Sequence, residues 1–259
     1  KKGRKIEIDV LIEDFNTMTR ELASNEMLKS DFIANVSHEI KAPLSIIQSY
    51  TKALKDGTAA PEQHKQYIDT IITATKNLNS MITNILKLNK LENQQIFPAP
   101  ETYQLGEQLR RCALSYMEQW QAKGIDFEID VEDVAVCYDA SLLELVWNNL
   151  LSNAIKFTET GGRISLTSQT RDNAVLVTIK DTGCGMDEET QKHIYDRFYR
   201  ADKSRNTPGF GLGLSLVQKI TELHKGSISV KSKVNEGSVF TLSLPKEAAI
   251  SNMRSQEAF

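Results

Sequence analysis

The chain has 259 residues, a formal net charge of −3 and 40% hydrophobic residues. This length exceeds a single ordinary core, so we expect two domains, or one domain with helical extensions. The basic residues are scattered and outnumbered by acidic ones, which excludes a protein that binds nucleic acid directly through a large basic surface. Cys112, Cys137 and Cys184 lie far apart, so neither a disulfide scaffold nor a zinc site is expected, and a reducing cytosol fits.

Residues 8–54 have the pattern of one long helix. Apolar residues recur there at intervals of four, three and four, the spacing of a coiled-coil seam, at Leu11, Phe15, Met18 and Leu22. This favours a helical dimer, and the alternative is one amphipathic helix packed on its own domain. No apolar run approaches the roughly 18 residues of a membrane span, and the start is not a signal peptide. The sequence begins without Met, so we expect a fragment of a longer, membrane-anchored protein.

The segment 56–61 ends this helix, because Gly57 is typical of a helix end and Pro61 of a helix start. A second apolar series at helical spacing then continues to about residue 93. Two long helices joined by a short turn make a hairpin whose apolar stripe is too wide for one partner helix. We therefore expect two hairpins to pair into a four-helix bundle.

The pattern changes after a linker at 97–100. Helices and strands then alternate without a strict βαβ order, which predicts an α/β sandwich with a mixed sheet rather than a doubly wound parallel sheet. A short turn predicts that the strands at 163–170 and 174–181 pair as a hairpin. The expected helices are 105–123, 141–157, 188–197 and 212–224, and the other expected strands are 126–131, 135–139, 227–232 and 238–245.

The sequence SHEIKAPL (37–44) lies inside the first helix. A nucleophilic imidazole must lose a proton, and the Glu39 carboxylate beside His38 can hold the tautomer and take that proton. Pro43 removes a hydrogen bond to the Glu39 carbonyl and is expected to bend the helix, at a cost of about 3 kcal/mol. A broken local rule beside a histidine is typical of a functional site. The alternative is an ordinary surface histidine near a kink.

Asn149, Asn153 and Lys156 fall at i, i+4 and i+7 of the helix at 141–157, so they share one face. Asn is a poor helix-interior residue, and a polar strip amid Leu and Ile therefore indicates a surface that faces a ligand. An Asn oxygen suits Mg²⁺, and a Lys ammonium suits phosphate. The alternative is a capping or interhelical hydrogen-bond role.

The loop DTGCGM (181–186) follows a predicted strand. Gly183 and Gly185 allow positive φ and a close approach of a ligand to the backbone. Asp181 can accept a hydrogen bond from an exocyclic amine such as that of adenine. Most isolated sequences of this kind are turns, which is the alternative here.

A second glycine-rich loop, TPGFGLGL (207–214), runs into a helix start. Backbone N–H groups at Gly209, Gly211 and Gly213 are placed to cradle phosphate. The spacing is neither the Walker pattern nor the dinucleotide fingerprint. Between the two loops lie RFYR (197–200) and a polar stretch at 201–208, which we expect to form a mobile lid.

In this order and spacing the motifs resemble the boxes of the sensor histidine kinases of two-component systems. The histidine box is 37–44, the N-box 147–158, the first glycine box 181–186, the F-box 197–200 and the second glycine box 209–214. The resemblance covers nearly all of 25–246. Residues 9–22 are also similar to the last helix of a HAMP signalling module, which implies transmembrane segments in the intact protein.

The resemblance implies a helical hairpin that forms a dimeric four-helix bundle, followed by a Bergerat-type α/β sandwich that binds ATP. The implied boundaries are a HAMP-like signalling helix at 1–24, the dimerisation and phosphotransfer hairpin at 25–96, the ATP-binding domain at 97–247 and a tail at 248–259. The implied partners are a second copy of the chain and the receiver domain of a response regulator. The implied location is the cytoplasmic side of a bacterial inner or plasma membrane.

By the same resemblance, His38 attacks the γ-phosphorus of ATP in line, with Glu39 as general base, and the phosphoryl group passes to an Asp of the regulator. Asn153 coordinates Mg²⁺, and Asp181 reads the adenine. The other residues implied to bind nucleotide are Asn149, Lys156, Gly183, Gly185, Phe198, Tyr199, Arg200, Gly209, Gly211, Leu212 and Gly213.

One position departs from the family. Four residues after the histidine, many members have a Thr or Asn that helps to place the water that dephosphorylates the regulator. Here that residue is Ala42, one helical turn from His38. We therefore expect weak phosphatase activity toward the regulator.

Two other functions compete with this interpretation. One is another ATPase of the same nucleotide-binding superfamily, which lacks phosphohistidine chemistry. SHEIKAPL on a helical hairpin argues against it. The other is a dimeric scaffold that binds nucleotide and transfers nothing, and the presence of all the expected chemical residues argues against that.

Overall fold

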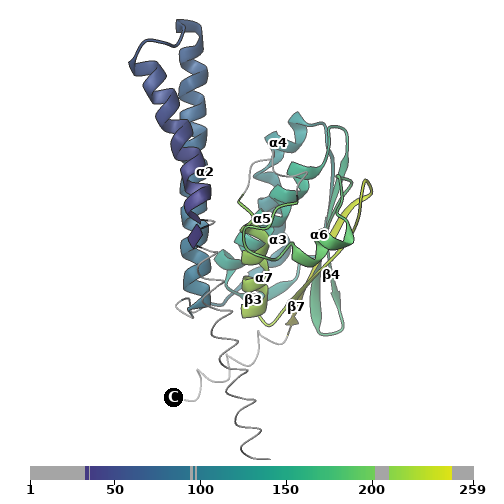
Figure 1. Cartoon of the computed structure of the whole chain (residues 1–259). Coiled ribbons are helices and arrows are strands. Elements are labelled where there is room, and N and C mark those ends of the chain that lie inside the picture. Colours follow the sequence, from purple (N-terminus) through teal and green to yellow (C-terminus); the bar gives the residue numbers. More distant parts are fainter. Residues whose placement is uncertain (1–32, 35, 94–95, 97, 202–209, 247–259) are drawn as a thin grey trace, which may run out of the picture. The chain divides into compact units, whose positions relative to one another are not determined.

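The computed structural model describes residues 33–34, 36–93, 96, 98–201 and 210–246 (Figure 1). The predicted signalling helix, the tail and all of the predicted lid except Ala201 lie outside these ranges. The chain divides into two compact units, the first ending at Ile82 and the second beginning at Thr83. The domain boundary at 96/97 stays a prediction. None of the helices in the described ranges has a stretch long and apolar enough to cross a membrane.

The first unit contains the predicted helical hairpin except for the last part of its second helix, which continues past Ile82. Its first helix is described without interruption from 36 to 55, and the chain runs through Pro43 without leaving the helix. Gly57 has φ +65 in the turn, and Pro61 opens the short 3-10 helix η1 (Pro61–Gln63), which leads into α2 (His64–Glu92). An edge-to-face contact of 4.7 Å between the Tyr50 and Tyr67 ring centroids joins the two helices. The turn chemistry read from the sequence is therefore the one observed.

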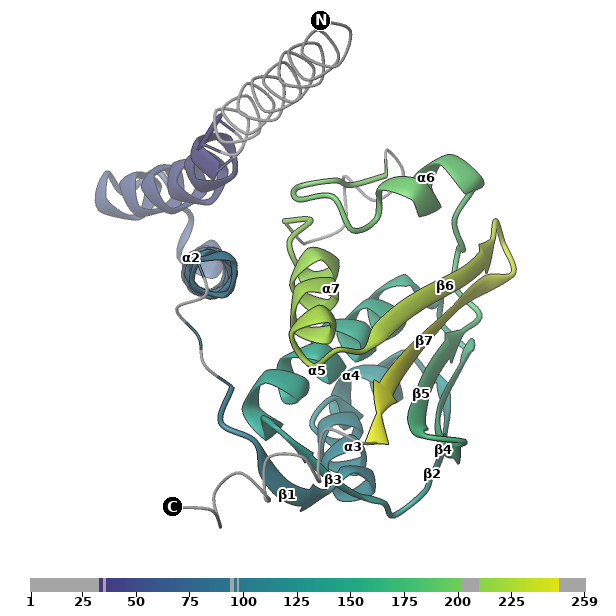
Figure 2. The same cartoon turned by 90° about the horizontal axis from the view of Figure 1, so that it is seen from below.

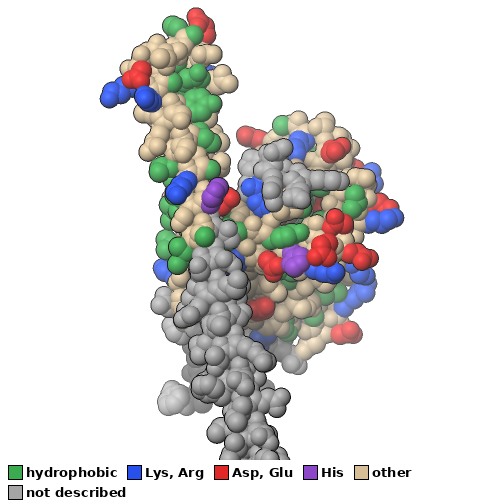
Figure 3. Space-filling view, in the orientation of Figure 1, with side chains coloured by type: hydrophobic (Ala, Val, Ile, Leu, Met, Phe, Trp, Pro, Cys, Tyr) green, Lys and Arg blue, Asp and Glu red, His purple; other side chains and the backbone are tan. Residues whose placement is uncertain are grey.

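Large apolar side chains are exposed along this hairpin. In the single chain, Leu44, Ile46, Ile68 and Ile72 are each between 40% and 48% exposed. Figure 3 shows hydrophobic side chains along the hairpin, whereas side chains of both charges are scattered over the second unit. An apolar stripe of this kind is typical of a surface that another protein covers.

The second unit contains a mixed five-stranded sheet in the order β2-β4-β5-β7-β6. The β2–β4 pair is parallel and the other pairs are antiparallel, and the predicted hairpin of β4 and β5 is present. A separate antiparallel pair joins β1 to β3. The bounds are β1 Glu101–Gln104, β2 Asp126–Val131, β3 Ala135–Tyr138, β4 Arg163–Arg171, β5 Ala174–Asp181, β6 Ser227–Lys233 and β7 Gly237–Pro245.

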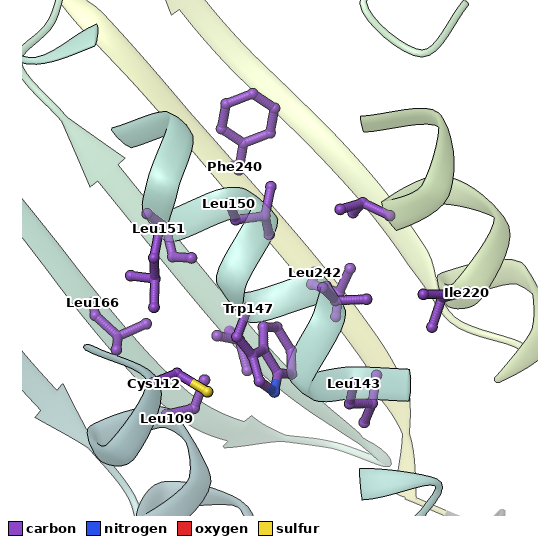
Figure 4. Close-up of a cluster of buried hydrophobic side chains, with 14 of the residues drawn as sticks. Leu109, Cys112, Leu143, Trp147, Leu150, Leu151, Leu166, Ile220, Phe240 and Leu242 are labelled. Carbon is purple, nitrogen blue, oxygen red and sulfur yellow. The ribbon is translucent and has the colours of Figure 1, made fainter. Parts of the chain in front are cut away.

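Helices cover one face of this sheet, which makes the predicted two-layer sandwich (Figure 2). They are α3 (Leu105–Leu114), α5 (Ala140–Phe157) and α7 (Gly213–Leu223). Trp147 of α5 is fully buried between Leu143, Leu150 and the sheet residue Leu242 (Figure 4). Its indole N–H donates to the Gln108 side chain at 2.9 Å, so this buried polar group is satisfied. The core thus fixes α5, the helix that carries the N-box.

Three details of the prediction are wrong. The helix expected at 105–123 is two helices, α3 and α4 (Met117–Ala122), because the Ser115 hydroxyl donates to the Cys112 carbonyl at 2.7 Å and this bond competes with the helical pattern. The helix expected at 188–197 is only α6 (Glu188–His193), since the chain turns away before Phe198, which has φ +62. Strand β1 was not expected, because its four residues are mostly exposed and show no alternation.

Candidate nucleotide site and phosphoacceptor helix

The predicted polar strip lies on one helix of the second unit. Asn149, Asn153 and Lys156 all belong to α5, and each is partly exposed although α5 is largely buried. Asp139 caps the start of this helix by accepting the Leu142 N–H at 3.0 Å. Burial alone would raise the pKa of Asp139, but hydrogen bonds from Ser141, Ala99 and Leu142 lower it overall. The carboxylate form therefore suits the cap.

Asn149 contacts the second glycine box. Its amide N–H donates to the Leu145 carbonyl at 2.7 Å, so part of the side chain has the helix hydrogen-bond role that the sequence left open. Its Oδ1 faces Gly213, the first residue of α7, where an added Cβ would lie 2.5 Å from that oxygen. A side chain at 213 would therefore have to displace the Asn149 amide from this position.

Asn153 is available to a ligand. Within the described part of the chain the side-chain amide of Asn153 takes part in no hydrogen bond or ion pair. An amide oxygen that is partly exposed and unengaged fits Mg²⁺, which takes few protein ligands and keeps waters and phosphate oxygens. The described residues contain no group of three or more His, Cys, Asp or Glu that would hold a metal by themselves.

Asp181 ends β5 and is 5% exposed. Its Oδ1 accepts the N–H groups of Gly183 at 2.8 Å and Ser238 at 3.3 Å. Burial raises the pKa of Asp181, and these two hydrogen bonds oppose that shift. The carboxylate is thus held by Oδ1, which leaves Oδ2 to accept from a ligand amine.

The two glycines of the first glycine box serve different purposes. Gly185 has φ +62, as predicted, and an added Cβ would lie 1.9 Å from the Lys233 carbonyl oxygen. Gly183 does not use the positive φ that a glycine allows. Its Cβ would instead lie 2.5 Å from the Phe157 carbonyl oxygen at the end of α5. The first glycine box therefore packs directly against the N-box helix.

The F-box packs against the second glycine box. The Phe198 N–H donates to the Gly211 carbonyl at 2.9 Å, and an added Cβ at Gly211 would lie 2.6 Å from the Phe198 carbonyl carbon. Tyr199 lies 5.4 Å from His193, measured between ring centroids. Leu212 is buried in the core at 2% exposure and precedes α7. Gly209 lies outside the described residues, so its predicted role is not placed.

Lys156 and Arg200 bring two cations to this part of the unit. Burial, and then the charge of Arg200, lowers the pKa of Lys156 to about 8. The ammonium lies over the Phe157 ring, 4.5 Å from its centroid. Positive charge at this point suits the phosphates of a nucleotide.

This pKa predicts how nucleotide affinity depends on pH. Below pH 8 the Lys156 ammonium is already charged, whereas above pH 8 phosphate binding must first return a proton to it. We expect the ADP dissociation constant to rise from pH 7 to pH 9, by at most about tenfold per pH unit. Calorimetry in two buffers with different ionisation enthalpies measures both the constant and the proton taken up. A matched Lys156→Met variant should bind more weakly at pH 7 and lose this dependence, and an equal dependence in that variant would contradict the assignment.

The sequence did not indicate four residues that form hydrogen bonds around these loops. Lys123 donates from its ammonium to the carbonyls of Ile155 at 2.7 Å, Lys156 at 3.1 Å and Thr158 at 3.0 Å, and so caps the end of α5. The Gln191 and Ser232 side chains bind the first glycine box from α6 and β6, and Ser238 of β7 binds it through its backbone N–H. The EGS sequence at 236–238 signals a turn, but nothing local indicates which loop that turn meets.

In the first unit, His38 is exposed on the first helix and Glu39 is partly exposed beside it. Ala42 is exposed one turn further on. Elsewhere on the hairpin a groove of about 580 Å³ is lined by Ile46 of the first helix and by eight residues of η1 and α2, namely Glu62, Lys65, Gln66, Asp69, Thr70, Thr73, Ala74 and Asn77. A solvent-accessible imidazole on a helix can meet both a donor and an acceptor of a phosphoryl group.

Two family models match the chain. Residues 28–94 match the His Kinase A (phospho-acceptor) domain, and residues 138–248 match the histidine kinase-, DNA gyrase B- and HSP90-like ATPase. The sensor protein SrrB of Staphylococcus aureus strain N315 is 32% identical over 249 residues, which are 95% of this chain and 42% of that protein. The chain thus spans about two fifths of the length of the curated relatives it matches.

Solved structures agree. The catalytic domain of the histidine kinase ThkA is 32% identical, with a TM-score of 0.52, over 57% of this chain and 96% of that one. The histidine kinase ThkA in complex with the response regulator protein TrrA is 28% identical, with a TM-score of 0.68, over 83% of this chain and 61% of that one. The Acinetobacter baumannii histidine kinase AdeS, at 22% identity and a TM-score of 0.69, shares the fold. The chain belongs to the histidine kinase family.

Proposed function

We propose that this chain is the catalytic part of a membrane-anchored sensor kinase, on the cytoplasmic side of a bacterial membrane, that phosphorylates His38 from ATP. The observation that carries the proposal is an exposed His38–Glu39 pair on a helical hairpin in the same chain as a nucleotide-type site. That site is built from the N-box face of α5, the Asp181 carboxylate and the close-packed glycine loops. The conjunction distinguishes the kinase from an ATPase that has only the second unit.

In the proposed reaction, one ring nitrogen of His38 attacks the γ-phosphorus of ATP. A nitrogen–phosphorus bond forms, the bond from the γ-phosphorus to the bridging oxygen breaks, and ADP leaves. Glu39 takes the proton from the other ring nitrogen. Asn153 would hold Mg²⁺, whose positive charge would offset the negative charge of the phosphates, while Asn149, Lys156 and Arg200 orient the phosphates and Asp181 binds the adenine amine. Protein groups mainly position the reactants in such a transfer.

The phosphoryl group then passes to an aspartate of a response regulator, because a phosphohistidine readily gives up its phosphoryl group. The groove on the hairpin, which carries both charges at Glu62, Lys65 and Asp69, supports docking of a receiver domain. The ThkA structure, which holds a response regulator, supports the same class of partner. The exposed apolar stripe of the hairpin supports pairing with a second copy into a four-helix bundle.

A pulse–chase experiment tests this function. The chain is incubated with ATP labelled at the γ-phosphate, nucleotide is removed, and candidate receiver domains are added. We expect an acid-labile, alkali-stable label on the chain that moves to one receiver domain within minutes. Release of free phosphate with no protein-bound label would instead support the ATPase, and nucleotide binding with neither outcome would support the scaffold.

Ala42 predicts an enzyme that phosphorylates its response regulator but dephosphorylates it only weakly. Its exposed methyl group lies one helical turn from His38 and offers no hydrogen bond to a water. We expect Ala42→Thr to accelerate dephosphorylation of the phosphorylated regulator about fivefold, because one hydrogen bond to a water is worth about 1 kcal/mol. Ala42→Val is the control, because valine has nearly the shape of threonine but no hydroxyl, and it should leave the dephosphorylation rate unchanged. Equal regulator half-lives with both variants would contradict this role.

A further inference from the structure

The main chain of Met186, the last residue of the first glycine box, is bound on both sides. Its N–H donates to the Ser232 hydroxyl of β6 at 2.8 Å. Its carbonyl accepts from the Gln191 side-chain amide of α6 at 3.1 Å, and the same amide donates to the Ser232 carbonyl at 3.0 Å. Met186, Gln191 and Ser232 thus form a closed ring of hydrogen bonds, which we call the Met186 clamp.

The clamp is connected to Asp181. The Ser232 hydroxyl donates to the Gly237 carbonyl at 2.8 Å and lies 2.9 Å from the Ser238 hydroxyl. A hydroxyl has one proton and two lone pairs, so Ser232 accepts from both Met186 and Ser238 and all its capacity is used. The Ser238 N–H donates to Asp181 Oδ1 at 3.3 Å. A continuous path of hydrogen bonds therefore runs from the end of the loop back to the carboxylate at its start.

The tip of the β6–β7 hairpin closes over the same loop. The Asn235 N–H donates to the Cys184 carbonyl at 2.7 Å, and Gly185 has no room for a Cβ beside Lys233. The hairpin does not need the clamp for its own pairing, because backbone pairing from Ser227–Ser243 to Lys233–Gly237 already fixes its register. The side-chain bonds of the clamp therefore hold the loop rather than the sheet.

We propose that Gln191 and Ser232 are positioning residues that hold the loop from Asp181 to Met186 in the shape that receives the nucleotide base. This inference rests on the proposed function, in which that loop binds adenine. The residues act through the loop and touch no phosphate. Their loss is therefore expected to weaken binding of the base and to leave phosphoryl transfer at saturating ATP nearly unchanged.

Affinities for adenosine, ADP and ATP, measured by calorimetry on the 259-residue chain, test the clamp. We expect Ser232→Ala and Gln191→Met each to raise the dissociation constants of all three ligands by a common factor of about tenfold, since each removes hydrogen bonds to a backbone group. Ser232→Thr keeps the hydroxyl and should restore binding. Ser229→Ala removes an exposed hydroxyl from the same strand and is the matched control.

Two results would overturn the proposal. One is an unchanged adenosine affinity in a folded Gln191→Met chain. This substitution lies on α6 and leaves strand β6 intact, so it still tests the proposal if Ser232→Ala does not fold. The other is a loss for ATP alone, which would place the effect at the phosphates. The label on wild-type His38 is read separately. A labelled wild type with an unaffected Gln191→Met variant refutes the clamp alone, and an unlabelled wild type refutes the kinase.

Discussion

Asn153→Ala is expected to reduce the labelling of His38 from ATP by at least about 100-fold, the usual effect of removing one group that stabilises transferred charge. Among Asn149, Asn153 and Lys156, Asn153 is the one whose side chain makes no hydrogen bond, ion pair or ring contact with another described residue, so the role proposed for it is toward Mg²⁺ and the phosphates. Its loss removes a metal ligand without opening the core, because the side chain is partly exposed. The melting temperature should therefore hardly change.

Asn148→Ala is the matched control for this prediction. Asn148 lies on the same helix with similar exposure but off the face shared by Asn149, Asn153 and Lys156. Its variant should be labelled at nearly the wild-type rate. The measurement is the initial rate of label incorporation at saturating ATP, with Mg²⁺ varied. If both variants lost the same activity, the effect would belong to the helix and not to the Asn153 amide.

Gly185→Ala is expected to abolish nucleotide binding and to destabilise the second unit by more than about 3 kcal/mol. Two effects add at this position. Alanine at φ +62 is strained by roughly 1–2 kcal/mol. Its Cβ would also lie 1.9 Å from the Lys233 carbonyl oxygen, a backbone atom that moves only if the β6–β7 hairpin moves.

Gly124→Ala separates these two effects. Gly124 has φ +59, close to that of Gly185, and an added Cβ there meets no atom within 4 Å. We expect this control to lower the melting temperature by about 2–6 °C, the strain effect alone, and Gly185→Ala to lower it by about 10 °C or more. The melting temperature and the ADP affinity are measured for each of the two variants. Equal shifts would mean that the contact with Lys233 is not a constraint.

The elements that the sequence predicted well are those with a local periodic signal. The polar strip at Asn149, Asn153 and Lys156 was predicted on one helix face, and α5 carries all three. The β4–β5 hairpin was predicted from two runs and a short turn, and it is present. In both cases the pattern that determines the element lies within a few residues of it.

Contacts between distant segments were not predictable in the same way. Ser232 and Gln191 are 41 residues apart, and each is an ordinary polar residue in its own segment. The sequence suggested that Gly183 allows positive φ or a close approach of a ligand, whereas the close approach comes from the end of α5, where Phe157 leaves no room for a Cβ. Strand β1 depends on pairing with β3, more than 30 residues later. These features depend on contacts with distant segments, and a single sequence does not indicate which segments come into contact.

The role of His38 is tested most directly by His38→Gln, labelled beside the wild type with γ-labelled ATP while ADP affinity is measured on both chains. Gln keeps the size and polarity of the side chain but offers no nucleophilic ring nitrogen. His38 lies on the first helix and the nucleotide site lies in the second unit, so ADP affinity should be unchanged. We predict no acid-labile label on the variant. A variant that keeps the label would contradict the assignment of His38 as the phosphoacceptor.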